Sequence, residues 1–304
     1  MESHIVRMEP IVLFAKSYLP DLLRAKRLAH SIVQFNRDRI PFFLSVPVAE
    51  MGVFRKHLSG YSVNLIADEQ VLDCASQAIA NNGSKVDNIP EHLFQQMVKA
   101  EFWRLGVCTN YVVLDSDSFF IKPFFKKDFL WSEDIPLTVM HEGKDFLQFA
   151  ARHGMKKLIK DYRQDRLLFH RLFATSGPLW DFGPTPVIWS SKVWQGLNDA
   201  FAASQNTHVV DLIRRHPCEL LWYGHYLVSS DIIPIIPIEP LFKCYHYRQQ
   251  YEESQRLGET ESVLAENFLG VVMQSNWDRT LSRDKGISFS NLLNKIRALF
   301  PKRR

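Results

Sequence analysis

The hydrophobic positions of the first 125 residues alternate between short continuous runs and longer stretches with helical spacing. Four apolar runs predict buried strands, at 11–15, 41–46, 62–66 and 111–114. Stretches with apolar residues three and four apart predict helices at 20–35, 49–57, 69–80 and 92–105. Repeated strand–helix units of this size indicate a mostly parallel sheet with helices on both faces, and therefore an α/β fold.

The second half of the chain is less regular. Helical spacing predicts helices at 146–162, 192–203 and 218–228, and residues 177–186 are rich in Pro and Gly. The run 232–238 predicts an edge strand, because Pro234 and Pro237 exclude a central position. A further strand is predicted at 269–274. We find no internal repeat, and we expect one domain over residues 1–285, followed by a C-terminal segment, 286–304.

Composition and charge exclude several classes of protein. Hydrophobic residues make up 46% and charged residues 23%, as in ordinary globular proteins. The net charge of +4 is mild and spread along the chain, so nucleic acid is not an expected partner. The four cysteines form no CxxC pair, which predicts reduced thiols in a cytoplasmic protein. No signal peptide is visible, and the longest apolar run is far shorter than the roughly 20 residues of a membrane span.

The strongest chemical signal follows the strand predicted at 111–114. There an apolar run ends in Asp115-Ser116-Asp117, two carboxylates separated by one small residue. Hard divalent cations such as Mg²⁺ and Mn²⁺ prefer oxygen ligands, and a cation held here could bridge a diphosphate. The alternative is an Asx turn, in which Asp only bonds its own backbone.

The predicted parallel sheet collects further polar residues at the same edge. Lys16, Ser17, Asp68 and Asp115 each follow a predicted strand, and ligands bind outside the carboxyl ends of such strands. Asp68 could accept a hydrogen bond from a base or ribose, or could be a helix N-cap.

Longer segments carry a resemblance to a known fold family. Residues 99–105 followed by 111–117 resemble the donor site of GT-A glycosyltransferases, and residues 14–18 resemble the nucleotide-binding start of that fold. Together with 95–99, 183–189 and Tyr223-Gly224, these segments are similar to a bacterial group of uncharacterised glycosyltransferase-like proteins, commonly associated with surface-polysaccharide synthesis. The resemblance implies a nucleotide-sugar-binding half at 1–125 and an acceptor-side half at 126–285.

The resemblance also implies roles for individual residues. Asp115 and Asp117 would hold Mn²⁺ or Mg²⁺ and the diphosphate, and Ser116 would lie near the ribose. Lys99 and Gln96 would face the donor sugar or its phosphates. Because they lie three residues apart they share a helix face, although Lys99 could also be a solvated lysine.

A third metal ligand is predicted from the C-terminal half, because GT-A enzymes often recruit a distant histidine. His246 is the first candidate, since it follows an apolar run and sits among aromatic residues, and His225 and His141 are alternatives. A lone histidine among aromatic residues is more often a hydrogen-bonded structural residue, and this alternative stays open for His246.

Acceptor activation by an inverting enzyme requires a carboxylate base. Glu219 is the first candidate and Asp181 the second, although Glu219 could simply complement a helix dipole. Four aromatic residues could stack on sugars or pack for their area alone: Trp180, Trp189, Trp222 and Tyr223.

The segment 286–304 has apolar residues on one helical face and basic residues around and after it. It could lie on an anionic membrane or dock on the domain. We expect a metal-dependent glycosyltransferase that uses a nucleotide-sugar donor and a saccharide or lipid-linked saccharide acceptor. We expect it in the cytoplasm, with contact at the inner face of the cytoplasmic membrane.

Two other functions fit parts of the sequence. A phosphohydrolase of the haloacid dehalogenase type also places Asp-x-Asp after an apolar strand, but there the motif opens the fold, whereas Asp115 follows three strand–helix units. A catalytically inactive nucleotide-sugar-binding protein would share the whole pattern.

Overall fold

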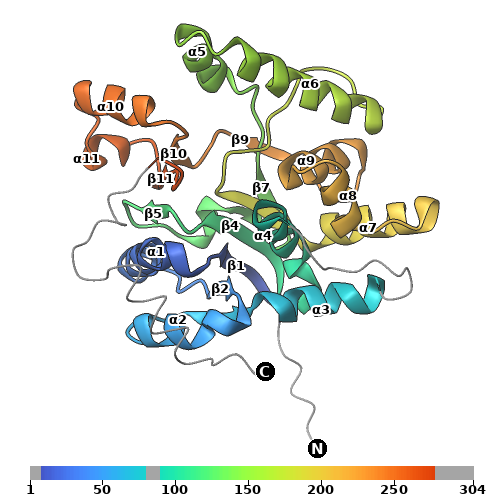
Figure 1. Cartoon of the computed structure of the whole chain (residues 1–304), viewed down its shortest axis with the longest axis horizontal. Coiled ribbons are helices and arrows are strands. Elements are labelled where there is room, and N and C mark those ends of the chain that lie inside the picture. Colours follow the sequence, from blue (N-terminus) through green and yellow to red (C-terminus); the bar gives the residue numbers. More distant parts are fainter. Residues whose placement is uncertain (1–7, 80–89, 278–304) are drawn as a thin grey trace, which may run out of the picture.

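The computed structural model describes residues 8–79 and 90–277, so the predicted C-terminal segment 286–304 lies outside the described residues. Its centre is a five-stranded sheet of order β3-β2-β1-β4-β8 (Figure 1). Its strands are β1 (Glu9–Lys16), β2 (Phe42–Val46), β3 (Asn64–Ala67), β4 (Cys108–Asp115) and β8 (Val187–Ser190). The first four run parallel and β8 is antiparallel to β4, which confirms the predicted mostly parallel α/β fold.

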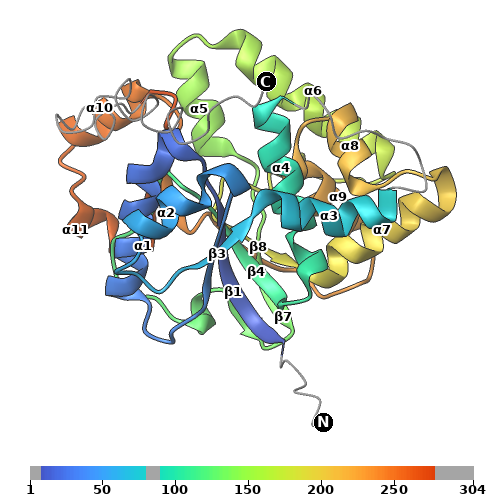
Figure 2. The same ribbon diagram turned by 60° about the horizontal axis from the view of Figure 1, so that its bottom comes forward.

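The order of the strands follows from how the chain crosses between them. The connecting helices are α1 (Leu22–Phe35), α2 (Met51–His57), α3 (Asp68–Ile79) and α4 (Glu91–Glu101). In Figure 2, α1 and α2 lie on one side of the strands, and α3 and α4 on the other. The direction of the crossovers therefore reverses between β3 and β4, so that β4 lies beside β1 and pairs Asp115 with Lys16.

Two small sheets extend the central one. One has the order β6-β7-β9, with β6 (Leu130–Ser132), β7 (Ile135–Val139) and β9 (Ile236–Ile238), and its edge strand β9 confirms the predicted edge position. The other has the order β10-β11-β5, with β5 (Ser118–Phe120), β10 (Phe242–Tyr245) and β11 (Gly270–Met273). Because β11 pairs with β5, a C-terminal segment lies against the residues that directly follow Asp117.

The second half differs from the sequence prediction at one informative place. The helix predicted at 146–162 is two helices, α5 (Lys144–Arg152) and α6 (Lys156–Leu172), which form an arm above the sheet in Figure 1. The break coincides with Gly154, whose φ of +66° lies in the left-handed region that ends helices and favours glycine.

The other helices of the second half are α7 (Ser191–Gln205), α8 (Val209–Arg215), α9 (Glu219–Ser229), α10 (Arg248–Arg256) and α11 (Glu261–Leu264). The predicted helices at 192–203 and 218–228 are confirmed, whereas α8, α10 and α11 had no counterpart among the predicted elements. One cluster of buried apolar side chains runs from Ile11 to Val272 and joins both halves. Within the described residues, no helix combines the length and apolar character needed to cross a membrane.

Candidate active site

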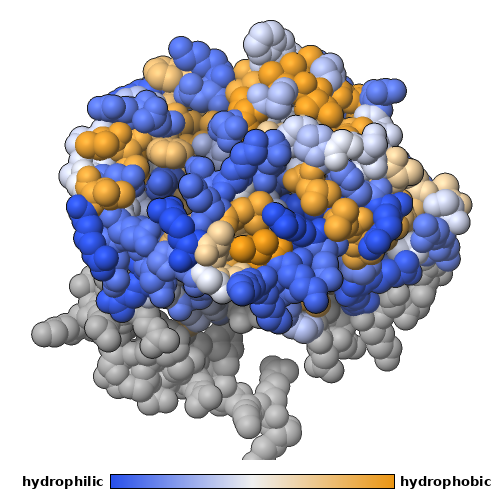
Figure 3. Space-filling view, turned by 90° about the horizontal axis from the view of Figure 1, so that it is seen from above, coloured by the Kyte–Doolittle hydropathy of each residue, from blue (hydrophilic) through white to orange (hydrophobic). Residues whose placement is uncertain are grey.

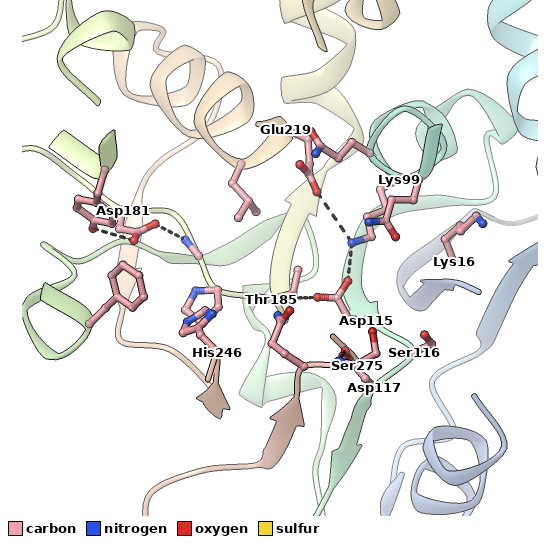
Figure 4. Close-up of a pocket in the computed structure, with 18 of the residues that line it drawn as sticks. Lys16, Lys99, Asp115, Ser116, Asp117, Asp181, Thr185, Glu219, His246 and Ser275 are labelled. Carbon is pink, nitrogen blue, oxygen red and sulfur yellow. Dashed lines mark hydrogen bonds and ion pairs between the residues drawn. The ribbon is translucent and has the colours of Figure 1, made fainter. Parts of the chain in front are cut away.

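A cavity of about 440 Å³ lies where the carboxyl ends of β1 and β4 meet the second half of the chain (Figure 4). The predicted donor-site residues, both candidate bases and the first-choice metal ligands all line it, except Ser17 and Asp68. The lining residues are Lys16, Asp21, Gln95, Gln96, Lys99, Asp115, Ser116, Asp117, His141, Phe146, Tyr162, Arg166, Asp181, Gly183, Pro184, Thr185, Glu219, Leu220, His246, Gln274 and Ser275. The fold therefore gathers residues from both halves at the edge where parallel sheets bind ligands.

Lys99 lies at the centre of the charges in this cavity. Helix α4 buries Met97 and Val98 in the core and turns Lys99 toward the end of β4, where the lysine is only 4% exposed. Its Nζ lies 2.5 Å from Asp115 Oδ1 and 3.9 Å from a carboxylate oxygen of Glu219 (Figure 4). Burial alone would lower the pKa of Lys99, but the two carboxylates outweigh it and raise the pKa, so the side chain is an ammonium ion.

Asp115, the last residue of β4, has a partner on each carboxylate oxygen. Oδ1 accepts a hydrogen bond from Lys99, and Oδ2 accepts one from the hydroxyl of Thr185, in the loop before β8. Burial raises the pKa of Asp115, but the charge of Lys99 and the hydrogen bonds from Lys99 and Thr185 together outweigh burial and lower the pKa below its ordinary value. Asp115 is therefore an ionised group held in one position.

Asp117 has a different environment from Asp115. Its Oδ2 accepts a hydrogen bond from the backbone N–H of Ser275, at 2.8 Å, just after β11. Its Oδ1 is buried and has no hydrogen-bond partner among the described residues. Burial, together with the charge of Asp115, raises the pKa of Asp117 to about 7. A buried carboxylate oxygen without a donor is costly unless a cation or ligand satisfies it, so Asp117 fits a metal ligand.

The described residues do not supply a complete metal-binding set. No group of three or more His, Cys, Asp or Glu side chains in 8–79 and 90–277 is placed to hold one ion. His246 lines the cavity, and its Nδ1 lies 3.7 Å from the Cys244 sulfur, but it does not join Asp115 and Asp117 in such a group. Burial lowers the pKa of His246, which favours the neutral imidazole that ligates metals.

His141 and His225, the two alternative candidates for a metal ligand, are held by contacts with the rest of the protein. His141 Nδ1 accepts a hydrogen bond from Gly143 N at 3.0 Å, so its other nitrogen carries the proton and donates to the carbonyl of Gly183 at 2.5 Å. His225 is 1% exposed, lies among phenylalanine rings and does not line the cavity. Neither ring offers a free nitrogen to the cavity.

The side of the cavity next to β1 and α4 contains Lys16, Gln96 and Ser116. The hydroxyl of Ser116 donates to Asp21 Oδ2 at 3.2 Å, which ties the Asp115–Asp117 turn to the segment before α1. Lys16 lines the cavity and pairs with Asp68 at 3.6 Å. Asp68 itself is fully buried at the start of α3, where it accepts a hydrogen bond from Ser45. Asp68 therefore acts on the cavity through Lys16 rather than by facing it.

Glu219 is the first residue of α9 and is 8% exposed. Burial raises its pKa, and the attraction of Lys99 offsets only part of that effect. A buried carboxylate with a raised pKa, facing a cavity, has the properties of a general base that works near neutral pH.

Both carboxylate oxygens of Asp181 accept hydrogen bonds from neighbouring residues. Its Oδ2 accepts hydrogen bonds from the hydroxyl of Tyr162 and from the Arg166 guanidinium, both at 2.8 Å. Its Oδ1 accepts one from the backbone N–H of Gly183 at 3.1 Å. Both oxygens of this carboxylate already accept hydrogen bonds, so the geometry favours Glu219 over Asp181 as a base.

The aromatic residues expected to stack on sugars lie elsewhere. Trp189, Trp222 and Tyr223 are at most 3% exposed and belong to the core, and neither they nor Trp180 line the cavity. Their area is used in packing between β8, α7 and α9, so of the two alternatives the packing role holds for these three residues. The aromatic cavity wall is Phe146 with Tyr162, whose ring centroids are 5.7 Å apart.

Several cavity residues were not predicted from the sequence. Asp21 falls in the first turn of the helix predicted at 20–35, Tyr162 is the last residue of the helix predicted at 146–162, and Arg166 lies beyond it. Thr185 lies inside the 183–189 segment that carried the family resemblance, so a signal for it existed. The role of Ser275 depends on a backbone N–H, which no side-chain pattern reveals.

Comparison with known proteins identifies the family of this chain and a solved structure with a similar fold. A family profile described as "Family of unknown function (DUF6492)" matches residues 4–292. No curated protein matches the sequence. The apo structure of mouse xyloside xylosyltransferase 1 is similar over 88% of this chain and 99% of that chain, with a TM-score of 0.50 and 8% identity. This likeness shows a shared fold, the GT-A type.

A second solved structure, the apo form of the bifunctional glycosyltransferase WbbM, matches 98% of this chain and 51% of that chain. The TM-score is 0.49 and the identity 9%. The chain thus spans about half of the length of WbbM.

Proposed function

The chain belongs to the DUF6492 family, and we propose that it is a glycosyltransferase that moves a sugar from a nucleotide-sugar donor to a saccharide or lipid-linked saccharide acceptor. The observation that carries the proposal is the pair Asp115 and Asp117 at the end of β4. One carboxylate is fixed by Lys99 and Thr185, and the other has a buried oxygen without a donor. The shared fold with a xylosyltransferase supports a sugar-nucleotide cavity at this edge.

The nucleotide side of the cavity binds the donor. Ser116 lies beside the ribose, and Lys16 and Gln96 contact the phosphates and the sugar. Mn²⁺ or Mg²⁺, held by Asp117 together with Asp115, would neutralise the charge that develops on the diphosphate leaving group. The Lys99 ammonium keeps Asp115 ionised and oriented for that purpose.

The acceptor side supplies the base. Glu219 takes the proton of the attacking hydroxyl, and Asp181, Tyr162 and Arg166 form the wall that positions the acceptor. The sequence resemblance supports a role in bacterial surface-polysaccharide synthesis. The dehalogenase-type phosphohydrolase fits less well, because its Asp-x-Asp opens the fold, whereas Asp115 ends β4, after three strand–helix units.

Calorimetry with a panel of nucleotide sugars, with and without Mn²⁺ or Mg²⁺, tests the proposal. We expect one donor to bind only with the metal present, and Asp117→Ala to weaken that binding at least about tenfold. Asp134→Ala, on the exposed turn between β6 and β7, is the matched control and should bind as the parent does. If no nucleotide sugar binds with either metal, the proposal is wrong. Slow donor hydrolysis by the parent protein separates an enzyme from an inactive binding protein.

A further inference from the structure

Helix α6 has two faces with different surroundings. Tyr162 and Arg166 point from one face into the cavity wall. The opposite face is exposed and carries a row of long basic side chains around one leucine: Lys156, Lys160, Arg163, Leu167 and Arg171. At 100° per residue these five fall within less than a quarter turn, so they form a single stripe, which we call the α6 stripe.

The α6 stripe is not neutralised by acidic residues of its own helix. Asp161 and Asp165 lie a third of a turn or more around the helix, and Asp161 bonds Lys157 at 3.1 Å. Residues 144–172 contain eight Lys or Arg and three Asp, whereas the whole chain has a net charge of only +4. This arm thus carries five more basic than acidic side chains.

The leucine of the α6 stripe, like its cations, indicates which kind of partner the stripe can bind. Leu167 is 45% exposed and lies between Arg163 and Arg171 in a row that extends over about 22 Å of helix. A row of cations around an exposed leucine suits a bilayer surface, where ammonium and guanidinium groups meet lipid phosphates and the leucine enters the acyl boundary. Binding of a soluble polyanion would leave the leucine side chain exposed to water. Figure 3 views the molecule from above, the side of the arm in Figure 1, and shows apolar patches separated by hydrophilic side chains.

We propose that the α6 stripe docks this protein on an anionic phospholipid bilayer. The opposite face of α6 lines the cavity, so docking would hold the Tyr162–Arg166 wall close to the membrane surface. This inference goes beyond the proposed glycosyl transfer, and it rests on charge and exposure alone. It also differs from the predicted membrane contact of 286–304, which lies outside the described residues.

Vesicle co-sedimentation of the full chain tests the proposal. The vesicles are phosphatidylcholine alone, or an equal mixture with phosphatidylglycerol. The variant is Lys156→Gln/Lys160→Gln/Arg163→Gln. The matched control, Lys26→Gln/Arg55→Gln/Lys56→Gln, removes three exposed cations from α1 and α2, which lie at the lower left of Figure 1, away from the arm at the top. A basic side chain near an anionic surface contributes roughly fivefold to binding, so the variant should partition about a hundredfold more weakly and the control nearly as the parent.

Three results would overturn the proposal. The first is a parent that binds both vesicles equally or neither. The second is a variant that binds as tightly as the control. The third is a pair of observations: Leu167→Ser keeps the parent's full affinity for anionic vesicles, and soluble polyphosphate displaces the parent protein from those vesicles. Together they would indicate a site for polyanions in solution. The assay measures vesicle binding only, so its outcome is independent of whether the cavity binds a nucleotide sugar.

Discussion

Replacing Lys99 by methionine isolates the charge at the centre of the cavity. Methionine fills a similar volume, so the main change is the loss of the ammonium ion between Asp115 and Glu219. At an effective dielectric constant of about 20, separations of 2.5 Å and 3.9 Å correspond to roughly 7 and 4 kcal/mol of attraction. Desolvation of the buried ammonium offsets several kcal/mol of this, so we expect Lys99→Met to lose about 3–5 kcal/mol of unfolding free energy at pH 8.

The loss should depend on pH with a definite sign. Without Lys99, the folded-state pKa values of Asp115 and Glu219 both rise above their unfolded values. A carboxyl with a raised folded pKa contributes stability below its unfolded pKa and loses it as the pH rises through the folded pKa. The deficit of Lys99→Met relative to the parent should therefore shrink between pH 8 and pH 5.

Urea unfolding followed by tryptophan fluorescence at both pH values measures the effect. Lys56→Met on the exposed surface of α2 is the matched control and should change the unfolding free energy by less than about 0.5 kcal/mol. Adding Asp115→Asn to Lys99→Met should recover more than about 1 kcal/mol of unfolding free energy, because it removes one of the two buried carboxylates that have lost their ammonium partner. A deficit below 1 kcal/mol at pH 8, or one of equal size at pH 5, would refute the reasoning.

Three further predictions concern other parts of the molecule. Burial lowers the pKa of His225 to about 4, so the contribution of its neutral imidazole to folding stability is complete above pH 6.5 and is lost as the pH falls through 4. His225→Gln should therefore remove up to about 3 kcal/mol of acid destabilisation, measured as the difference in unfolding free energy between pH 7 and pH 4. A Cβ on Gly224 would lie 2.1 Å from the Phe182 ring, so Gly224→Ala should cost about 1–3 kcal/mol by thermal unfolding, whereas Gly52→Ala, with open space around it, should be neutral or slightly stabilising. If Glu219 is the base, Glu219→Gln should keep donor affinity within about twofold in calorimetry and slow sugar transfer or donor hydrolysis by a factor on the order of 10²–10⁴; an unchanged rate would exclude that role.

The order of elements in the first half could be predicted because its signals are local. Buried strands are continuous apolar runs and their helices are amphipathic, so β1 to β4 and the helices between them follow from the sequence alone. The position of Asp115 at a strand end follows from the same pattern. The sheet edge then brings Lys16 beside Asp115, because the carboxyl ends of parallel strands meet there.

The second half shows where local signals fail. The apolar spacing continues from α5 into α6, so one helix was predicted, and only the left-handed backbone at Gly154 separates the two. Strand β8 follows the Pro- and Gly-rich stretch and gains its partner, β4, from a position about 75 residues earlier. Trp189 and Trp222 could have faced either a ligand or the core, and burial decided for the core.

The sequence by itself determined that the chain has a mostly parallel sheet with a pair of carboxylates at the end of its fourth strand. Only the tertiary structure decided how those carboxylates differ. Lys99 from α4 and Thr185 from the loop before β8 hold Asp115, while the pairing of β11 with β5 brings Ser275 to Asp117 and leaves one of its oxygens unbonded. The reason is physical: the ionisation and ligand affinity of a carboxylate depend on burial and on the charges around it, and these come from segments far apart in the chain.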